Sequence, residues 1–133
     1  IHCSRLAADH MEARGHGNII NVSSIAARVG GSPGASIYAG AKGFVSSFSK
    51  SLAKELVGHG IRVNCVSPGT IHTSFHDRFS TAEKREAARQ TIPMQRLGLA
   101  DDCTGTFLYL ASDEASGYVT GQVIEVNGGQ LMA

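Results

Sequence analysis

Apolar residues recur along the chain with two spacings, one typical of helices and the other of buried strands. Within residues 36–57 an apolar side chain returns every three or four positions, at Ile37, Ala41, Phe44, Phe48, Leu52 and Leu56. This spacing predicts a helix with one apolar face, and Gly58 and Gly60 are suited to end it. Short runs rich in β-branched residues indicate strands buried on both faces, as in a parallel sheet. These runs are NIINVSS (18–24), IRVNCVS (61–67) and QVIEV (122–126).

Further helices are predicted on either side of these elements. Residues 1–17 begin as a helix already in progress, because no Ser, Thr, Asp or Asn cap precedes Ile1. We therefore expect the sequence to be the remainder of a longer protein. Cap residues predict two more helices, over residues 81–90 after a capping box of Ser80 and Glu83, and over residues 102–112 after Asp101.

Helices and strands alternate along the chain, and the glycine-rich residues 25–35 form a loop between the first strand and the long helix. This alternation predicts right-handed crossovers and a parallel sheet. The expected fold class is therefore α/β, with three parallel strands and flanking helices in one domain. A doubly wound sheet normally has more than three strands, which again indicates residues upstream of Ile1.

Several polar side chains are expected at one edge of this sheet. In open α/β sheets, ligands bind beyond the carboxyl ends of the strands. Ser23 and Ser24 end the first strand, and the segment SPGTIHT (67–73) ends the second. Tyr38 and Lys42 lie in the first turns of the long helix, which follows the first strand. Chain order thus brings a hydroxyl, a phenol, an ammonium and a proline–glycine turn to the same edge.

The spacing of Tyr38 and Lys42 has two interpretations. In one, Lys42 is a solvated surface residue that shares a helix face with Tyr38. In the other, Lys42 lowers the proton affinity of the phenol, which titrates near pH 10 when free and is then too basic for neutral pH. A positive charge about 4 Å from the phenolate stabilises it by roughly 4 kcal/mol at an effective dielectric near 20. This would move the titration of the phenol down by about three pH units, before the cost of desolvation is counted. Ser24 would then hold a substrate oxygen by a hydrogen bond, and a hydride carrier would exchange a hydride with the substrate carbon.

Composition excludes several other classes of function. A net charge of +1 does not indicate the positively charged surface that binds nucleic acid or an anionic membrane. No apolar run approaches the roughly 20 residues of a membrane span, and no signal peptide is recognisable. Cys3, Cys65 and Cys103 are odd in number and form no C-x-x-C pair. They are interpreted as reduced thiols of a cytoplasmic protein, without a metal or disulfide role.

Four segments in succession resemble the signatures of the short-chain dehydrogenase/reductase family, of its compact type. They are NVSS (21–24), YAGAK (38–42), RVNCVSPGTIHT (62–73) and GYVTGQVIEVNGG (117–129). The resemblance covers essentially the whole chain. It implies a Rossmann-like doubly wound fold and an oxidoreductase that interconverts a secondary alcohol and a ketone with NAD or NADP.

The resemblance also implies roles for individual residues. Ser24, Tyr38 and Lys42 match the catalytic residues of the family, although the gap from Ser24 to Tyr38 is 14 positions, where many members have 13. This leaves Ser23 as the alternative hydroxyl. Tyr38 and Lys42 would also contact the cofactor, Lys42 at the nicotinamide ribose. The segment that holds the nicotinamide end is matched by Pro68, Gly69, Ile71 and Thr73.

The sequence departs from the family pattern in what it lacks. The glycine-rich dinucleotide turn, the residue that selects NAD or NADP, and the catalytic asparagine all precede the serine in the family, and none is present here. Residues 1–133 are therefore expected to be the C-terminal half of one such domain, without its dinucleotide-binding half. An alternative from another class is a non-catalytic fragment that serves only as a folding or association module.

Two further expectations concern partners. His72 and His76 are four positions apart, a spacing that can bind a metal from a helix. No third potential ligand lies at a sequence spacing typical of a metal site, so no metal is expected. The resemblance implies packing of the long helix and the helix before it against a second subunit, hence a homodimer or homotetramer that acts on a small alcohol or ketone.

Overall fold

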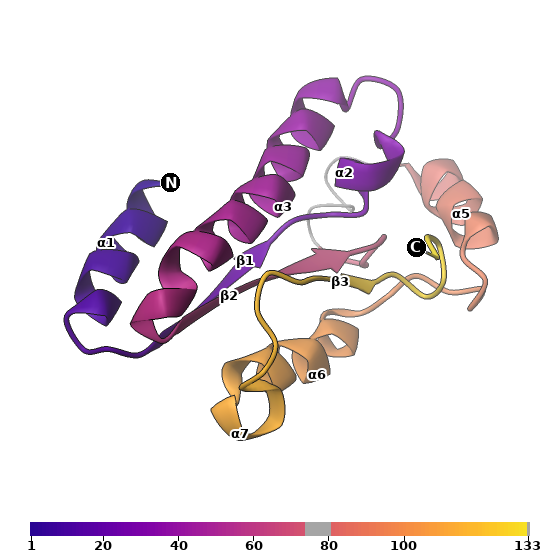
Figure 1. Cartoon of the computed structure of the whole chain (residues 1–133). Coiled ribbons are helices and arrows are strands. Elements are labelled where there is room, and N and C mark those ends of the chain that lie inside the picture. The colour runs from indigo at the N-terminus through magenta and orange to yellow at the C-terminus, as the bar shows by residue number, and fades with distance from the viewer. Residues whose placement is uncertain (74–80, 133) are drawn as a thin grey trace.

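The computed structural model describes residues 1–73 and 81–132 (Figure 1). Within these residues the chain forms a three-stranded sheet with helices on both faces. The elements in order are α1 (His2–Glu12), β1 (Gly17–Val22), α2 (Ala26–Val29), α3 (Ser36–Leu56), η1 (Val57–His59), β2 (Ile61–Pro68), α5 (Ala82–Thr91), α6 (Ala100–Ala111), α7 (Asp113–Ser116) and β3 (Val123–Val126).

The sheet is parallel, with strand order β1-β2-β3. Gly17 to Val22 pair with Ile61 to Val66, and Cys65 to Pro68 pair with Val123 to Val126. Helix α3 connects β1 to β2 and packs with α1 against one face, whereas α6 packs against the other (Figure 1). The predicted α/β fold class is confirmed.

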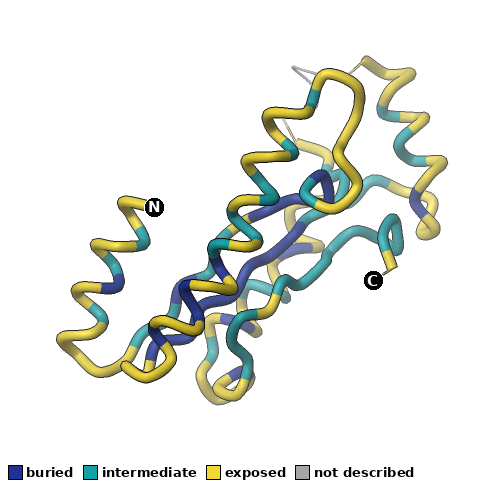
Figure 2. Tube along the Cα trace, turned by 45° about the horizontal axis from the view of Figure 1, so that its top comes forward, coloured by how far each residue is buried: buried dark blue, intermediate teal, exposed yellow. Residues whose placement is uncertain are grey.

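The core lies between α3 and the sheet. Strand β2 is buried from Ile61 to Ser67 because helices cover both of its faces (Figure 2). On α3, Leu52 and Leu56 from the predicted apolar face are buried against Ile61 and Val63. Ile37 from the same face is 88% exposed.

The length of α3 explains why its apolar face is only partly buried. Its 21 residues span about 31 Å, whereas the six residues of β1 span about 20 Å. The first turns of α3 therefore extend beyond the sheet at the carboxyl ends of the strands, as Figure 1 shows. Phe44 is half exposed there and stacks on Phe48, with 5.5 Å between ring centroids.

Helix boundaries differ from the predictions at three points. A single turn, α2, interrupts the predicted loop, because Ser24 Oγ accepts the Ala26 N–H and Gly30 ends the turn with φ 82°. Helix α5 is capped by Thr81, whose side chain accepts the Lys84 N–H; the predicted cap, Ser80, lies outside the described residues.

Helix α6 begins two residues earlier than predicted. Its cap position is Leu99, and Asp102 rather than Asp101 reaches back to accept the Leu99 N–H at 2.7 Å. The Arg96 guanidinium binds the same carboxylate with both of its terminal nitrogens, at 2.6 and 2.8 Å. This ion pair holds the pKa of Asp102 well below its usual range, so the carboxylate stays charged and fixes the start of α6.

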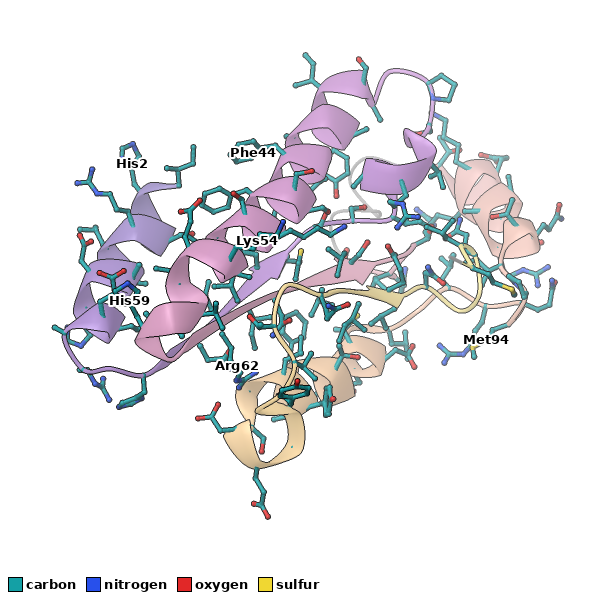
Figure 3. The ribbon with its side chains drawn as sticks, viewed as in Figure 1. His2, Phe44, Lys54, His59, Arg62 and Met94 are labelled. Carbon is teal, nitrogen blue, oxygen red and sulfur yellow. The ribbon has the colours of Figure 1, made fainter. Side chains whose placement is uncertain are left out.

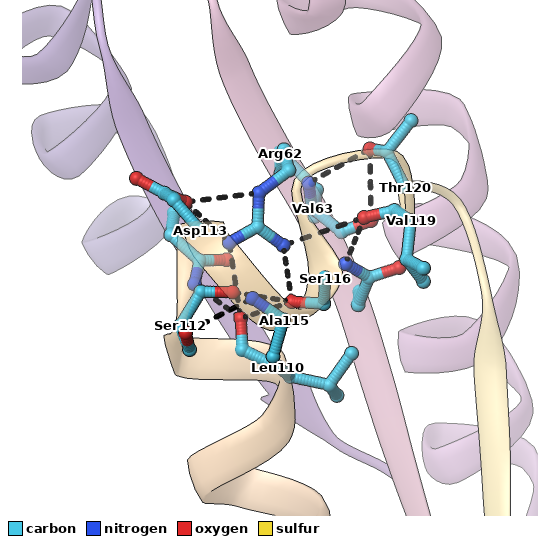
Figure 4. A network of polar contacts seen from close by, with 11 residues as sticks. Arg62, Val63, Leu110, Ser112, Asp113, Ala115, Ser116, Val119 and Thr120 are labelled. Carbon is cyan, nitrogen blue, oxygen red and sulfur yellow. Dashed lines mark hydrogen bonds and ion pairs between the residues drawn. The ribbon is translucent and has the colours of Figure 1, made fainter.

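A buried arginine ties the end of α6 to the sheet (Figure 4). Arg62 in β2 is 8% exposed and donates to Asp113 Oδ1 from Nε and Nη2, at 3.2 and 2.6 Å. It also donates to Ser116 Oγ and to the carbonyls of Leu110 and Val119. One side chain therefore donates hydrogen bonds to α6, to α7 and to the segment that leads to β3.

Candidate active site

Ser23 follows β1 and is used to hold α3. Its N–H donates to the Val66 carbonyl at 2.8 Å, which continues the β1–β2 pairing. Its Oγ donates to the Lys42 carbonyl at 2.8 Å and lies 2.7 Å from Ser46 Oγ. With an exposed fraction of 2%, this hydroxyl is committed to the contact between the end of β1 and the middle of α3.

Ser24 has a different environment. Its Oγ accepts the Ala26 N–H at 3.2 Å at the start of α2. A hydroxyl has one hydrogen and two lone pairs, so this contact occupies only one lone pair. The next residue, Ile25, donates its N–H to the Pro68 carbonyl at 2.9 Å. Ser24 is therefore held beside the carboxyl end of β2.

Tyr38 and Lys42 meet in the first turns of α3. Lys42 Nζ lies 5.8 Å from the centroid of the Tyr38 ring, within the range of a cation–π contact. The same ammonium donates to the Val22 carbonyl, the last of β1, at 2.9 Å. Tyr38 is 44% exposed. The predicted proximity of the pair is confirmed, and Lys42 in addition touches β1, which its sequence position did not predict.

The turn after β2 is packed against the C-terminal end of the described chain. The Gly69 N–H donates to the Val126 carbonyl at 2.9 Å. A Cβ on Gly69 would lie 2.6 Å from Asn127 Cβ and 2.8 Å from its Cα, so only glycine fits. Beyond it, Ile71 bridges to Gly98, and Thr73 is exposed.

Two buried polar atoms lie on adjacent strands near this turn. Ser67 Oγ and Glu125 Oε1 have no hydrogen-bond partner among residues 1–73 and 81–132, and Ser67 is paired with Glu125 in the register of β2 and β3. Nothing in the sequence pattern indicated Glu125, because its strand reads as apolar.

A cavity of about 330 Å³ lies beside the same turn. It lies between the turn after β2 and the segment that leads into α6. The residues that line it include Thr70, Ile71, Met94, Arg96, Gly98, Asn127 and Gly129. The ion-paired Arg96 and Asp102 both line it, as does Glu125.

The cysteines and histidines contribute no second centre in the part of the chain that the structure describes. Burial raises the pKa of the Cys65 and Cys103 thiols, so both stay protonated at neutral pH. No group of three His, Cys, Asp or Glu that could hold a metal occurs among the described residues. His72 lies next to Gly98, whose carbonyl accepts its N–H, and His76 lies outside the described residues.

No helix in the described ranges has the length and apolar character needed to cross a membrane. The residues predicted for the site lie after the carboxyl ends of β1 and β2 and in the first turns of α3. Val22, Ser23 and Ile25 connect β1, α3 and the end of β2 there.

Similar proteins share both the sequence and the fold. Residues 1–130 match the family described as enoyl-(acyl carrier protein) reductase. A 3-oxoacyl-[acyl-carrier-protein] reductase FabG from Rickettsia felis is 41% identical over 129 residues, which are 97% of this chain and 52% of that protein. Human dehydrogenase/reductase SDR family member 4 is 42% identical over 127 residues, 95% of this chain and 45% of that protein.

A solved structure shows the same similarity in fold. The gluconate 5-dehydrogenase from Burkholderia cenocepacia, in complex with NADP and tartrate, superposes with a TM-score of 0.87 at 34% identity and covers 92% of this chain and 48% of that one. The chain spans about half the length of the curated relatives it matches. It belongs to the short-chain dehydrogenase/reductase family, of which it represents the C-terminal portion.

Proposed function

We propose that the protein containing this chain is an NAD(P)-dependent oxidoreductase that interconverts a secondary alcohol and a ketone. The observation that carries the proposal is the contact of the Lys42 ammonium with both the Tyr38 ring and the end of β1, which precedes Ser24 in the sequence. An alcohol oxidation requires a base for the hydroxyl proton, and a ketone reduction requires an acid for the oxygen. Tyr38 would serve in both directions.

Each residue has a distinct task in this proposal. Ser24 would donate its hydroxyl hydrogen to the substrate oxygen and hold it near the phenol. Tyr38 would take the substrate proton in oxidation and return it in reduction. Lys42 would favour the phenolate, since an adjacent positive charge stabilises the charged form. Ser23 is excluded from this role in the proposal because its hydroxyl is committed to α3.

The chain's residues fit one end of a nicotinamide cofactor. The Lys42 ammonium and the exposed Thr73 hydroxyl could donate to ribose and carboxamide oxygens, and Pro68, Gly69 and Ile71 shape the turn between them. When bound, the nicotinamide exchanges a hydride with the substrate carbon. The described residues contain no G-x-G-x-x-G turn that leads from a strand into a helix N-terminus, where a pyrophosphate would bind, so the adenosine end would require residues outside this chain.

We also propose a homo-oligomer, a dimer or tetramer. Helix α1 and the first turns of α3 carry exposed apolar residues, including Leu6, Ile37 and Phe44. Contiguous exposed apolar surface marks interaction sites. A monomer of the intact protein in light scattering at micromolar concentration would contradict this proposal.

The test of the proposed function is Tyr38→Phe in the intact protein. Only the phenolic oxygen and its proton are removed, and one general acid–base group contributes about 10²–10⁴-fold. We expect turnover to fall by that factor while the circular dichroism spectrum is unchanged. Tyr118→Phe, at a fully exposed tyrosine, is the matched control. Turnover of Tyr38→Phe close to that of the parent would refute the assignment of the acid–base role to Tyr38. Absence of turnover by the intact parent would instead favour the alternative of a non-catalytic association module.

A further inference from the structure

The side chain of Gln130 joins two segments that are far apart in the sequence. Its Oε1 accepts a hydrogen bond from Thr70 Oγ1 at 3.3 Å. Its Nε2 donates to Thr91 Oγ1 at 3.1 Å. Thr70 belongs to the turn after β2, and Thr91 is the last residue of α5. Both polar ends of one amide are therefore used to connect these two segments.

The backbone around Gln130 is held closely on both sides. Gly128 and Gly129 have φ values of 63° and 85°, in the left-handed region that favours glycine. A Cβ on Gly128 would lie 2.8 Å from Ile92 Cγ2. The Met94 N–H, in the segment labelled in Figure 3, donates to the Gly128 carbonyl at 3.1 Å. The C-terminal turn thus has little freedom to shift relative to the residues that follow α5.

The other side of the turn contacts the proposed cofactor segment. A Cβ on Gly69 would meet Asn127 Cβ at 2.6 Å and Gln130 Oε1 at 3.3 Å. Asn127 is itself fixed, because its Oδ1 accepts the Gly129 N–H at 3.0 Å and its Nδ2 donates to the Leu131 carbonyl at 3.2 Å. Movement of the C-terminal turn would therefore be transmitted directly to Gly69 and Thr70.

We propose that Gln130 is a positioning residue, which fixes the turn of residues 68–73 relative to α5 and so supports binding of the nicotinamide end of the cofactor. This inference rests on the proposed function for the role of residues 68–73. Gln130 touches no reacting atom and acts through Thr70 and Thr91. No local signal in the sequence indicates it, because its partners lie 60 and 39 positions away.

The directions of the hydrogen bonds determine which variants are informative. Thr91 Oγ1 donates its hydrogen to the Ala88 carbonyl at 2.7 Å, so it can only accept from Gln130. Gln130→Glu would place a second acceptor against it and lose this contact, while a carboxylate oxygen could still accept from Thr70. Thr91→Val removes the same contact from the other side, and Thr91→Ser retains the accepting hydroxyl. Gln130→Met removes both contacts.

The experiment uses the intact protein and two measurements. Titration with NADH and with NADPH, followed by nicotinamide fluorescence, gives the Kd of each cofactor. Hydrogen–deuterium exchange reports on residues 68–73 and 82–91. We expect Gln130→Met to raise the Kd by about three- to tenfold, the size of one or two lost hydrogen bonds, and to speed exchange in both segments. Gln130→Glu and Thr91→Val should each have a smaller, non-additive effect, and Thr91→Ser should restore the parent's values.

The control is Gln122→Met, just before the opposite end of β3, where the residue is exposed and its side-chain amide donates to the nearby Thr120 carbonyl. Unchanged exchange in both segments of Gln130→Met would overturn the proposal. Faster exchange with an unchanged Kd would overturn the positioning role as well. If the parent binds cofactor but turns over no alcohol or ketone, the proposed function fails, while the Kd and exchange results still decide the role of Gln130.

Discussion

The Lys42 ammonium makes two contacts that a lysine surrounded by water would lack. It lies over the Tyr38 ring and donates to the Val22 carbonyl. These contacts hold the charge between the phenol and the end of β1. The effect of Lys42 on the proton affinity of Tyr38 stays a prediction.

At the residue scale we predict the effect of Lys42→Ala in the intact protein. Without the ammonium, the phenol would bind its proton more tightly, so the phenolate would form only at higher pH. The rate of alcohol oxidation should fall at neutral pH, and its remaining pH–rate profile should move to higher pH. Lys54→Ala, an exposed lysine on the same helix (Figure 3), is the matched control. A profile at the parent's position would contradict the prediction.

Single residues differ in how far the sequence predicted them. The proximity of Tyr38 and Lys42 follows from helical geometry alone. The choice between Ser23 and Ser24 does not, because both follow the same strand and only the contacts of Ser23 with α3 distinguish them. The contacts of Gln130 depend on tertiary packing across the chain, so no local sequence pattern predicts them.

At the scale of elements, Arg62 connects β2 to α6 and α7, and its substitution tests this connection. Arg62→Met in the intact protein would remove the guanidinium hydrogen bonds to the Leu110 and Val119 carbonyls. These carbonyls would keep their other donors, the side chains of Asn18 and Ser116 for one and of Asn64 for the other. We expect a loss of about 2–3 kcal/mol in the free energy of unfolding, since a hydrogen bond that involves a charged group contributes about 1.5–3 kcal/mol. Urea denaturation measures this difference.

Asp113→Asn provides the contrast to Arg62→Met. The Asp113 side chain is 80% exposed, and exposed ion pairs contribute about 0–1 kcal/mol. Its loss should therefore cost less than that of Arg62, even though the two side chains bind each other. Equal losses for the two variants would show that the ion pair, rather than the carbonyl contacts, accounts for the role of Arg62.

The regular elements were predictable because their patterns are local. Hydrophobic spacing predicted α3 and the strands, with boundaries close to those observed. The single turn α2 was missed, because four residues are too few to show a helical period. The start of α6 was misplaced because Asp101 and Asp102 are adjacent, and only the contact of Asp102 with Arg96 and Leu99 shows which of them reaches back.

At the scale of the whole molecule, the sheet has an open side. Within the described residues β1 pairs only with β2, so its other edge presents unpaired peptide groups. Such an edge can pair with another chain. Strand β1 also carries the Val22 carbonyl that binds Lys42, which places the open edge directly next to the candidate site.

The last prediction concerns a polypeptide of residues 1–133 alone. It should neither bind a dinucleotide tightly nor turn over an alcohol, because it offers only the nicotinamide end of a site. The pyrophosphate is normally held by backbone N–H groups at a helix N-terminus after a G-x-G-x-x-G turn, and no such turn follows a strand in the described residues. Titration of this polypeptide with NADH and NADPH, with the intact protein as control, measures binding through nicotinamide fluorescence. Light scattering on the same samples should show association through the open edge of β1. Saturable binding at micromolar cofactor by the polypeptide would contradict the prediction, and would mean that a second chain completes the site across that edge.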